Sequence, residues 1–330
     1  MTRKVLFDTD PGCDDAVALA IALASDEIEV VGVSTVAGNT AVENTTHNAL
    51  SVLELFDRAD VPVARGCTGP LCRDLETAEE IHGPDGIRGD PPEPTGEPVS
   101  RHGVAFIRDR VREYGDDLTI VAIGPQTNLA TALAIDEDLP ATVDEIYLMG
   151  GAALCPGNVT PAAEFNFYVD PEAVSRVFRG ATPRVVGLDV TAAATVPAAT
   201  IEELVAAGEP QRTLAAWLGY SEIEAIRDGA LAGDRAIHDA TVIVDLLDDV
   251  LDYREVPVAV DTGDGPFRGA IAPDIEGTTD DLPTARVALD VDESTHRGRS
   301  PGRRCDEHAE GRCRRRVVRR APGGEVRHGG

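Results

Sequence analysis

The sequence predicts an α/β protein with a single domain, in which helices cover both faces of an open, mostly parallel, doubly wound sheet. Three observations lead to this fold class. Runs typical of strands alternate with runs typical of helices, which is the pattern of βαβ units. The strand-like runs are almost continuously apolar, as expected of strands buried on both faces. The 330 residues, 42% of them hydrophobic, suffice for one large domain with a full core.

The expected elements follow one another in a regular order. The strand-like runs are Lys4–Asp8, Glu29–Val36, Leu118–Ile123, Glu145–Met149 and Arg184–Leu188. The helix-like runs between them are Asp14–Ala24, Val42–Phe56, Gly103–Glu113, Asn128–Ile135 and Glu172–Phe178. A late helix is expected over His238–Leu247, and further strands near Val256–Val260, Phe267–Ile271 and Ala285–Leu289. Residues 83–100, rich in Pro, Gly and Asp, are expected to form a surface loop, and residues 207–235 a mobile flap.

The composition changes abruptly near the end of the chain. Eleven Arg and four Asp or Glu stand between Arg297 and Gly330, whereas the whole chain has a net charge of −28. We therefore assign residues 1–292 to the folded domain and 293–330 to a basic, Arg-rich tail that adds little to the core. The tail is either an interaction segment or the product of a shifted reading frame that replaced a native final helix. The abrupt change favours the second explanation.

The strong negative charge argues against nucleic acid or anionic membranes as partners. Lys4 is the only lysine, and high acidity without lysine is typical of proteins from a high-salt cytoplasm, so we expect a halophilic source.

No run approaches the roughly 18 apolar residues of a membrane span. The chain opens on a strand-like run and not on a leader peptide, so we expect a cytoplasmic protein. Its six scattered cysteines form no C-x-x-C pair, which predicts reduced thiols and no zinc site.

Four aspartates crowd into the first turn of the chain. Asp8, Asp10, Asp14 and Asp15 follow the apolar run Val5–Phe7, at the carboxyl end of a strand, where open α/β sheets bind their ligands. Carboxylates so close together repel one another unless they share a proton or a cation, and Ca²⁺ or Mg²⁺ would take oxygens from Asp10 and Asp15. The alternative is that Asp14 and Asp15 only cap a helix. The cluster holds more acids than a cap needs, which favours a metal site.

The same residues begin a series of motifs that resembles the nucleoside hydrolases of the inosine-uridine preferring type. The resemblance runs in order to about residue 290, and its motifs are the N-terminal Asp8–Ala16, Val36–Asn39 after the second strand, His82–Gly86, Gly124–Ala130 after the central strand, Gly157–Asn166 and His238–Ala240. Each motif alone is modest, but six in the family's order are specific. The resemblance implies a Rossmann-like nucleoside hydrolase fold and hydrolysis of ribonucleosides to ribose and free base.

The resemblance also implies a role for each matching residue. A calcium ion would be held by Asp10, Asp15, Asp239 and the carbonyl of Ile123, and Asp10 would act as general base on a calcium-bound water. His238 would protonate the leaving base, with His82 as the second candidate near the base or the pocket rim. The ribose would be bound by Asp14 and Asn166 at its 2′ and 3′ hydroxyls, by Glu164 and Asn158 at its 5′ hydroxyl, and by Asn39. Asp8 would support the turn.

Several points stay open in the sequence. The preferred base is not determined, because Trp217 and Tyr220, the aromatic residues of the expected flap, lie in no motif that separates purines from pyrimidines. The family implies a homodimer or homotetramer. One rival reading is a haloacid-dehalogenase-type phosphatase with Asp8 as nucleophile, which the lack of a downstream lysine disfavours. Another is a calcium-dependent nucleoside-binding homologue without catalysis.

Overall fold

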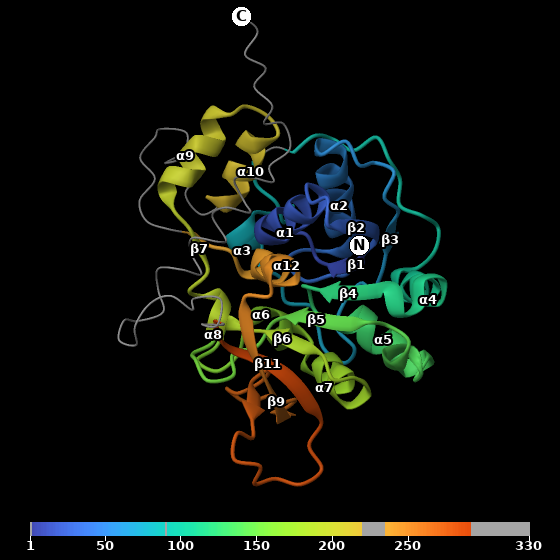
Figure 1. Cartoon of the computed structure of the whole chain (residues 1–330), viewed down its shortest axis with the longest axis vertical. Coiled ribbons are helices and arrows are strands. Elements are labelled where there is room, and N and C mark those ends of the chain that lie inside the picture. The colour runs from blue at the N-terminus through green and yellow to red at the C-terminus, as the bar shows by residue number, and fades with distance from the viewer. Residues whose placement is uncertain (1, 90, 220–234, 292–330) are drawn as a thin grey trace, which may run out of the picture.

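The structure, a computed structural model, describes residues 2–89, 91–219 and 235–291 (Figure 1). Its central sheet contains β1 (Arg3–Thr9), β2 (Ile28–Thr35), β3 (Val63–Arg65), β4 (Leu118–Ala122), β5 (Glu145–Met149), β6 (Arg184–Val186), β9 (Leu251–Val260), β10 (Ile271–Pro273) and β11 (Thr284–Val291). The strand order is β10-β9-β11-β6-β5-β4-β1-β2-β3. All strands from β11 to β3 run parallel, and β9 and β10 add an antiparallel edge.

Helices pack on both faces of the sheet. The described helices are α1 (Cys13–Leu23), α2 (Val42–Leu55), α3 (Glu79–His82), α4 (Gly103–Tyr114), α5 (Thr127–Ile135), α6 (Phe165–Val169), α7 (Pro171–Gly180), α8 (Leu188–Thr191), α9 (Ala198–Ala206), α10 (Gln211–Leu218) and α12 (His238–Asp248). One core joins α1, α2, α9, α10 and α12, and the other joins α4, α5 and α7 (Figure 1). A small antiparallel pair, β7 (Thr195–Val196) and β8 (Arg235–Ala236), lies beside the first core.

The site is positioned by the direction in which the chain crosses the sheet. From β1 the chain proceeds outward through β2 to β3, and it then returns to place β4 on the other side of β1. Crevices open at the carboxyl ends of strands where the winding reverses in this way. Asp8 at the end of β1 pairs with Ser34 of β2 and with Ala122 of β4. The aspartate turn therefore begins at this reversal point.

The predicted fold class is confirmed, and the elements differ from expectation mainly at one edge. The strand expected over Phe267–Ile271 is wrong, because Phe267 is 59% exposed in a turn and β10 begins only at Ile271. The turn is closed by a hydrogen bond from the Arg268 N–H to the Gly265 carbonyl, and Gly269 has a φ of +78° that favours glycine. The short strand β3 was not predicted, since three residues carry little periodic signal.

The expected flap is described only in part, and the expected tail lies wholly outside the described residues. Residues 198–218 form the two helices α9 and α10, whereas residues 220–234 and the tail 293–330 lie outside the described residues. Residues 83–89 and 91–98 contain neither a helix nor a strand, as expected of a loop. Among the described residues, no helix combines the length and the apolar character that crossing a membrane requires.

Candidate active site

A cavity of about 510 Å³ opens at the carboxyl ends of β1, β4 and β5. Its walls come from the starts of α1 and α12, from the segment around α3, and from α6 with the loop before it. The residues that line it are Asp14, Asp15, Asn39, Glu76, Thr77, Ala78, Glu80, Ile81, His82, Ile123, Met149, Asn158, Val159, Glu164, Phe165, Asn166, Tyr168, His238 and Asp239. The structure thus brings ten of the eleven predicted site residues to the lining of one cavity, and the exception is Asp10.

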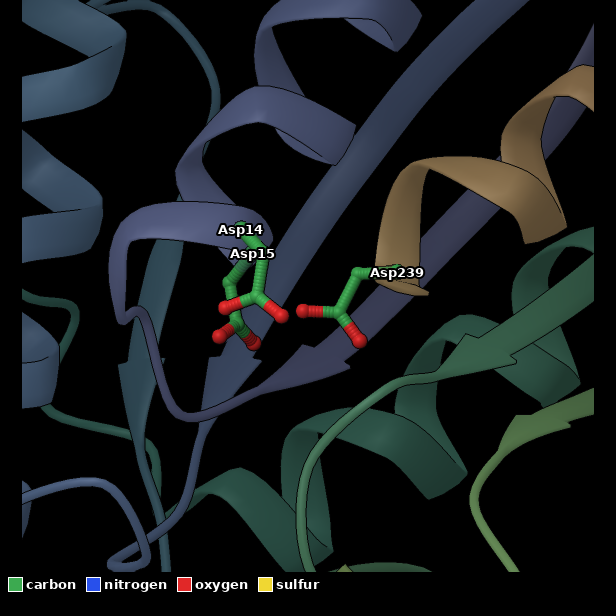
Figure 2. A group of neighbouring side chains, drawn as sticks. All are labelled: Asp14, Asp15 and Asp239. Atoms are coloured by element: carbon green, nitrogen blue, oxygen red, sulfur yellow. The ribbon is translucent and has the colours of Figure 1, made fainter. Parts of the chain in front are cut away.

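Three carboxylates converge on the floor of the cavity from two helices. Asp14 and Asp15 stand in the first turn of α1, and Asp239 stands in the first turn of α12 (Figure 2). One oxygen of each lies within 4.8 Å of the others. Helix N-termini stabilise negative charge, so the two packed helices α1 and α12 support the acids that they present.

Asp15 is fixed by three donors, and it is 2% exposed. The Thr9 hydroxyl donates to Oδ1 at 2.5 Å, and the Gly12 N–H donates to Oδ2 at 3.0 Å. The Asn39 side-chain amide donates to the same Oδ2 at 3.1 Å. Because the three donors come from the end of β1, from the turn after it and from the loop after β2, the carboxylate has little freedom to leave the floor of the cavity.

Asp10, the predicted base and ligand, lies just outside this group of three. Its Oδ2 accepts a hydrogen bond from the Asn39 N–H at 2.6 Å, while its buried Oδ1 accepts none from the described residues. Gly38 and Gly124 leave the room that the carboxylate occupies, because a Cβ at either position would lie 2.1 or 2.5 Å from an Asp10 oxygen. A buried carboxylate oxygen that accepts no hydrogen bond has lone pairs available to a cation.

Burial and mutual repulsion disfavour the charged forms of these acids. Burial is the main reason that the pKa values of Asp10 and Asp239 lie well above the ordinary value, and it also raises that of Asp15. The charges of neighbouring aspartates raise all three pKa values further. A hard cation among these oxygens would offset the repulsion. The donor set therefore fits a divalent metal.

Asp8 connects the start of the aspartate turn to neighbouring elements through hydrogen bonds. Its Oδ1 accepts from the Ser34 hydroxyl at 2.6 Å and from the Asn128 side-chain amide at 2.8 Å. Burial raises its pKa to about 6, and the two hydrogen bonds oppose this rise. Asp8 is not among the residues that line the cavity, which agrees with a supporting role.

Two histidines stand on the wall of the cavity. The Nδ1 of His238 lies 2.9 Å from the Thr191 hydroxyl, and burial lowers the pKa of the ring. His82 is 6% exposed, and its Nδ1 accepts a hydrogen bond from the Cys13 N–H at 3.2 Å. That bond fixes the orientation of the His82 ring, and a neutral ring then carries its proton on Nε2.

The polar residues around α6 form the opposite wall. Both oxygens of Glu164 accept backbone N–H groups, from Gly151, Asn166 and Phe167, at 2.9 to 3.2 Å. Burial nevertheless raises the pKa of Glu164 to about 7. The Asn166 amide donates to the Ile123 carbonyl at 2.9 Å, and the Asn158 Oδ1 accepts from the Phe165 N–H at 3.0 Å. The carbonyl predicted as a metal ligand thus has an amide donor in this structure.

Sequence reasoning missed part of the wall. Glu76, Ile81, Phe165 and Tyr168 line the cavity, and only Phe165 lies within a recognised motif. Trp217, a candidate for base stacking, is fully buried in the core and does not line the cavity. The other candidate, Tyr220, lies outside the described residues.

Comparisons with known proteins point to one family. The family model of the inosine-uridine preferring nucleoside hydrolases matches residues 5–297. The pyrimidine-specific ribonucleoside hydrolase RihA of Salmonella enteritidis PT4 is 41% identical over 296 residues, 88% of this chain and 95% of that protein.

Two solved structures with the same fold are also named as nucleoside hydrolases. The plant nucleoside hydrolase PpNRh1 has a TM-score of 0.84 and 30% identity, over 96% of this chain and 99% of that one. A purine-preferring ribonucleoside hydrolase from Gardnerella vaginalis has a TM-score of 0.83 and 29% identity, over 97% and 99% of the two chains.

Proposed function

The chain belongs to the inosine-uridine preferring nucleoside hydrolase family and is a hydrolase that acts on N-glycosidic bonds of ribonucleosides, and from this premise we propose its substrate preference and its mechanism. The preferred substrates are pyrimidine ribonucleosides, which it cleaves to ribose and free base. The observation that carries the mechanism is the convergence of Asp14, Asp15 and Asp239 on the floor of the cavity.

Cleavage of the glycosidic bond leaves positive charge on the sugar in an oxocarbenium-like transition state. Carboxylates that are already in place favour such charge as it develops. The cavity offers the three converging aspartates together with Glu164, and it contains no Lys or Arg among its lining residues. This distribution of charge supports the proposal that the ribose binds over the floor.

A divalent cation, calcium in our proposal, would be held by Asp10, Asp15, Asp239 and the Ile123 carbonyl. When bound, it supplies positive charge that acidifies a neighbouring water and offsets the repulsion among the acids. Asp14 lies close enough to Asp15 and Asp239 to be a further ligand, or to bind the ribose hydroxyls with Asn166. Asn39, Asn158 and Glu164 complete the ribose site.

The reacting protons pass through two side chains. Asp10 accepts a proton from water as the water oxygen bonds to the anomeric carbon, and the carbon–nitrogen bond breaks with its electron pair moving to the base. His238 in its imidazolium form gives the Nε2 proton to the departing base and returns to the neutral ring, while its Nδ1 stays hydrogen-bonded to the Thr191 hydroxyl. His82, fixed by the Cys13 N–H, lies at the side of the cavity where the base would bind.

Pyrimidine preference is supported by the 41% identity to a pyrimidine-specific relative. The direct test measures release of reducing sugar from uridine, cytidine, inosine and adenosine, in high salt, with calcium and with a chelator. We expect turnover of uridine and cytidine to exceed that of the purine nucleosides and to stop with the chelator. Faster turnover of inosine would overturn the preference, and full activity in the chelator would overturn the metal requirement. Equilibrium binding of uridine without sugar release would favour a non-catalytic binding protein.

A further inference from the structure

Two stretches far apart in the sequence contact each other beside the cavity through two arginines. Each stretch contributes one arginine that binds residues of the other. We call residues 73–82 the rim segment, because Glu76 to His82 supply one wall of the cavity. We call residues 261–270, between β9 and β10, the hairpin loop. Arg73 of the rim segment reaches into the hairpin loop, where it contacts the Thr262 carbonyl at 2.5 Å and Asp264 at 2.6 Å. It also pairs with Glu172 of α7 at 2.7 Å.

Arg268 of the hairpin loop makes the opposite connection. Its guanidinium lies 2.6 Å from the Glu76 carboxylate, and its carbon centre lies 4.1 Å from the centre of the Tyr168 ring. The Tyr168 hydroxyl in turn lies 3.2 Å from Glu76. The Arg268 side chain is only 12% exposed, which strengthens its cation–π contact with Tyr168, whereas the Glu76 side chain is 51% exposed, so solvent screens the ion pair in part.

A glycine in the hairpin loop allows its backbone to pack closely against α6. Gly269 has a φ of +78°, and a Cβ on it would lie 2.5 Å from the Tyr168 Cα. A side chain at this position would therefore push the hairpin loop off α6. The close packing places the neighbouring Arg268 directly over the Tyr168 ring.

Glu76 and Tyr168 line the cavity from two different walls, whereas Arg268 does not line it. We propose that Arg268 is a positioning residue for substrate binding: it joins Glu76 of the rim segment to Tyr168 of α6 and so fixes the width of the cavity mouth. This inference rests on the proposed function for its substrate, a ribonucleoside. Arg268 acts on binding and not on the reacting atoms, because the groups it fixes are wall residues.

The test compares Arg268→Gln with the wild type and with a matched control, Arg101→Gln. Arg101 pairs with Asp109 on α4 at 2.7 Å, and neither residue lines the cavity. We expect Arg268→Gln to raise the KM for uridine about tenfold and to change kcat less than about threefold, the pattern of lost uniform binding. Arg268→Lys keeps the charge but not the planar stacking, and it should restore part of the KM. Arg101→Gln should match the wild type.

A second readout is independent of catalysis. Amide hydrogen exchange in the rim segment, where the Ala78 N–H donates to the Asn39 carbonyl and the His82 N–H to the Ala78 carbonyl, should accelerate in Arg268→Gln and not in the control. Unchanged KM and unchanged exchange would overturn the inference, as would an equal loss of activity in Arg268→Lys and Arg268→Gln. Faster exchange in a protein whose wild type releases no sugar would refute the proposed function and leave the positioning role standing.

Discussion

Asp15 and Asp239 begin two helices from opposite ends of the described chain, and their carboxylate oxygens lie within 4.8 Å of each other on the floor of the cavity. The helices α1 and α12 that carry them pack together through one continuous core. The distance between the two acids is therefore set by the packing of apolar side chains, and both acids are almost completely buried. Four predictions test this arrangement and the residues around it.

Replacing Asp239 by Asn should weaken metal binding while it stabilises the metal-free fold. The variant should bind calcium weakly and lose more than about a hundredfold in turnover, the upper figure for loss of an outer-shell partner. In a chelator at pH 8 it should melt at a higher temperature than the wild type, because one repelling charge is gone. Calorimetric titration and thermal melting measure both effects.

The control is Asp249→Asn, at the other end of α12. Asp249 is exposed and has a φ of +48°, a conformation that Asn tolerates. This variant should bind calcium and turn over like the wild type. Wild-type calcium affinity in Asp239→Asn would show that this carboxylate is not a ligand.

Replacing Gly124 by Ala should disturb Asp10 without changing any charge. The new Cβ would lie 2.5 Å from Asp10 Oδ1 and 3.0 Å from the Asp10 backbone nitrogen. We expect the free energy of unfolding to fall by about 1–3 kcal/mol, the usual cost of overpacking. Calcium should also bind more weakly. Gly96→Ala, whose Cβ would meet only Leu50 at 3.7 Å, is the control in the same urea denaturation series. Equal calcium affinity in both variants would contradict a role for Asp10 Oδ1.

Replacing His238 by Ala should reduce kcat for uridine by about 10²–10⁴, the range for a lost general acid. An aryl riboside whose leaving group needs no proton should be much less affected. The paired measurement is kcat for uridine and for 4-nitrophenyl riboside, with His47→Ala as control, since His47 lies on the surface near Glu93 and not at the cavity. The same fractional loss on both substrates would remove His238 as the acid.

Glu164 should make folding stability depend on pH. Burial raises its folded pKa from 4.5 to about 7, so the folded state holds the proton more tightly than the unfolded chain. The resulting stabilisation is complete below about pH 4.5 and is lost as the pH rises through 7, in total on the order of 3 kcal/mol. Urea denaturation across this window should show a smaller loss in Glu164→Gln than in the wild type, although Gln has one acceptor fewer for the backbone N–H groups. Parallel curves for the two proteins would contradict the raised pKa.

The sequence predicted most of the fold because its signals were local and repeated. Strand and helix periodicity located β1, β2, β4 and β5 to within two residues at each end. β11 was located to the same accuracy, whereas the edge formed by β9 and β10 was less well predicted. Its strands pair antiparallel and are partly exposed, so apolar runs mark their ends poorly. The apolar residues near Phe267 therefore predict a strand where the structure has a turn.

The sequence predicted which residues belong to the candidate site better than it predicted how their atoms are arranged. Motifs named the residues that meet in the cavity, but spacing along the chain does not tell which oxygens converge. Asp10 was expected in the metal group, yet Asp14 is the residue whose oxygen lies near those of Asp15 and Asp239. The rim residue Glu76 and the α6 residue Tyr168 carried no signal, because their partner Arg268 lies in a loop far along the sequence.

The origin of the three floor carboxylates has a consequence for biosynthesis. The ribosome makes Asp14 and Asp15 among the first residues and Asp239 only after all the strands from β1 to β6. A nascent chain that ends before α12 therefore exposes the first two acids without their third partner and without the core that α12 shares with α1. Under the proposed function, ion binding would thus require synthesis to proceed past the start of α12, and a product terminated before it would lack one of the proposed metal ligands.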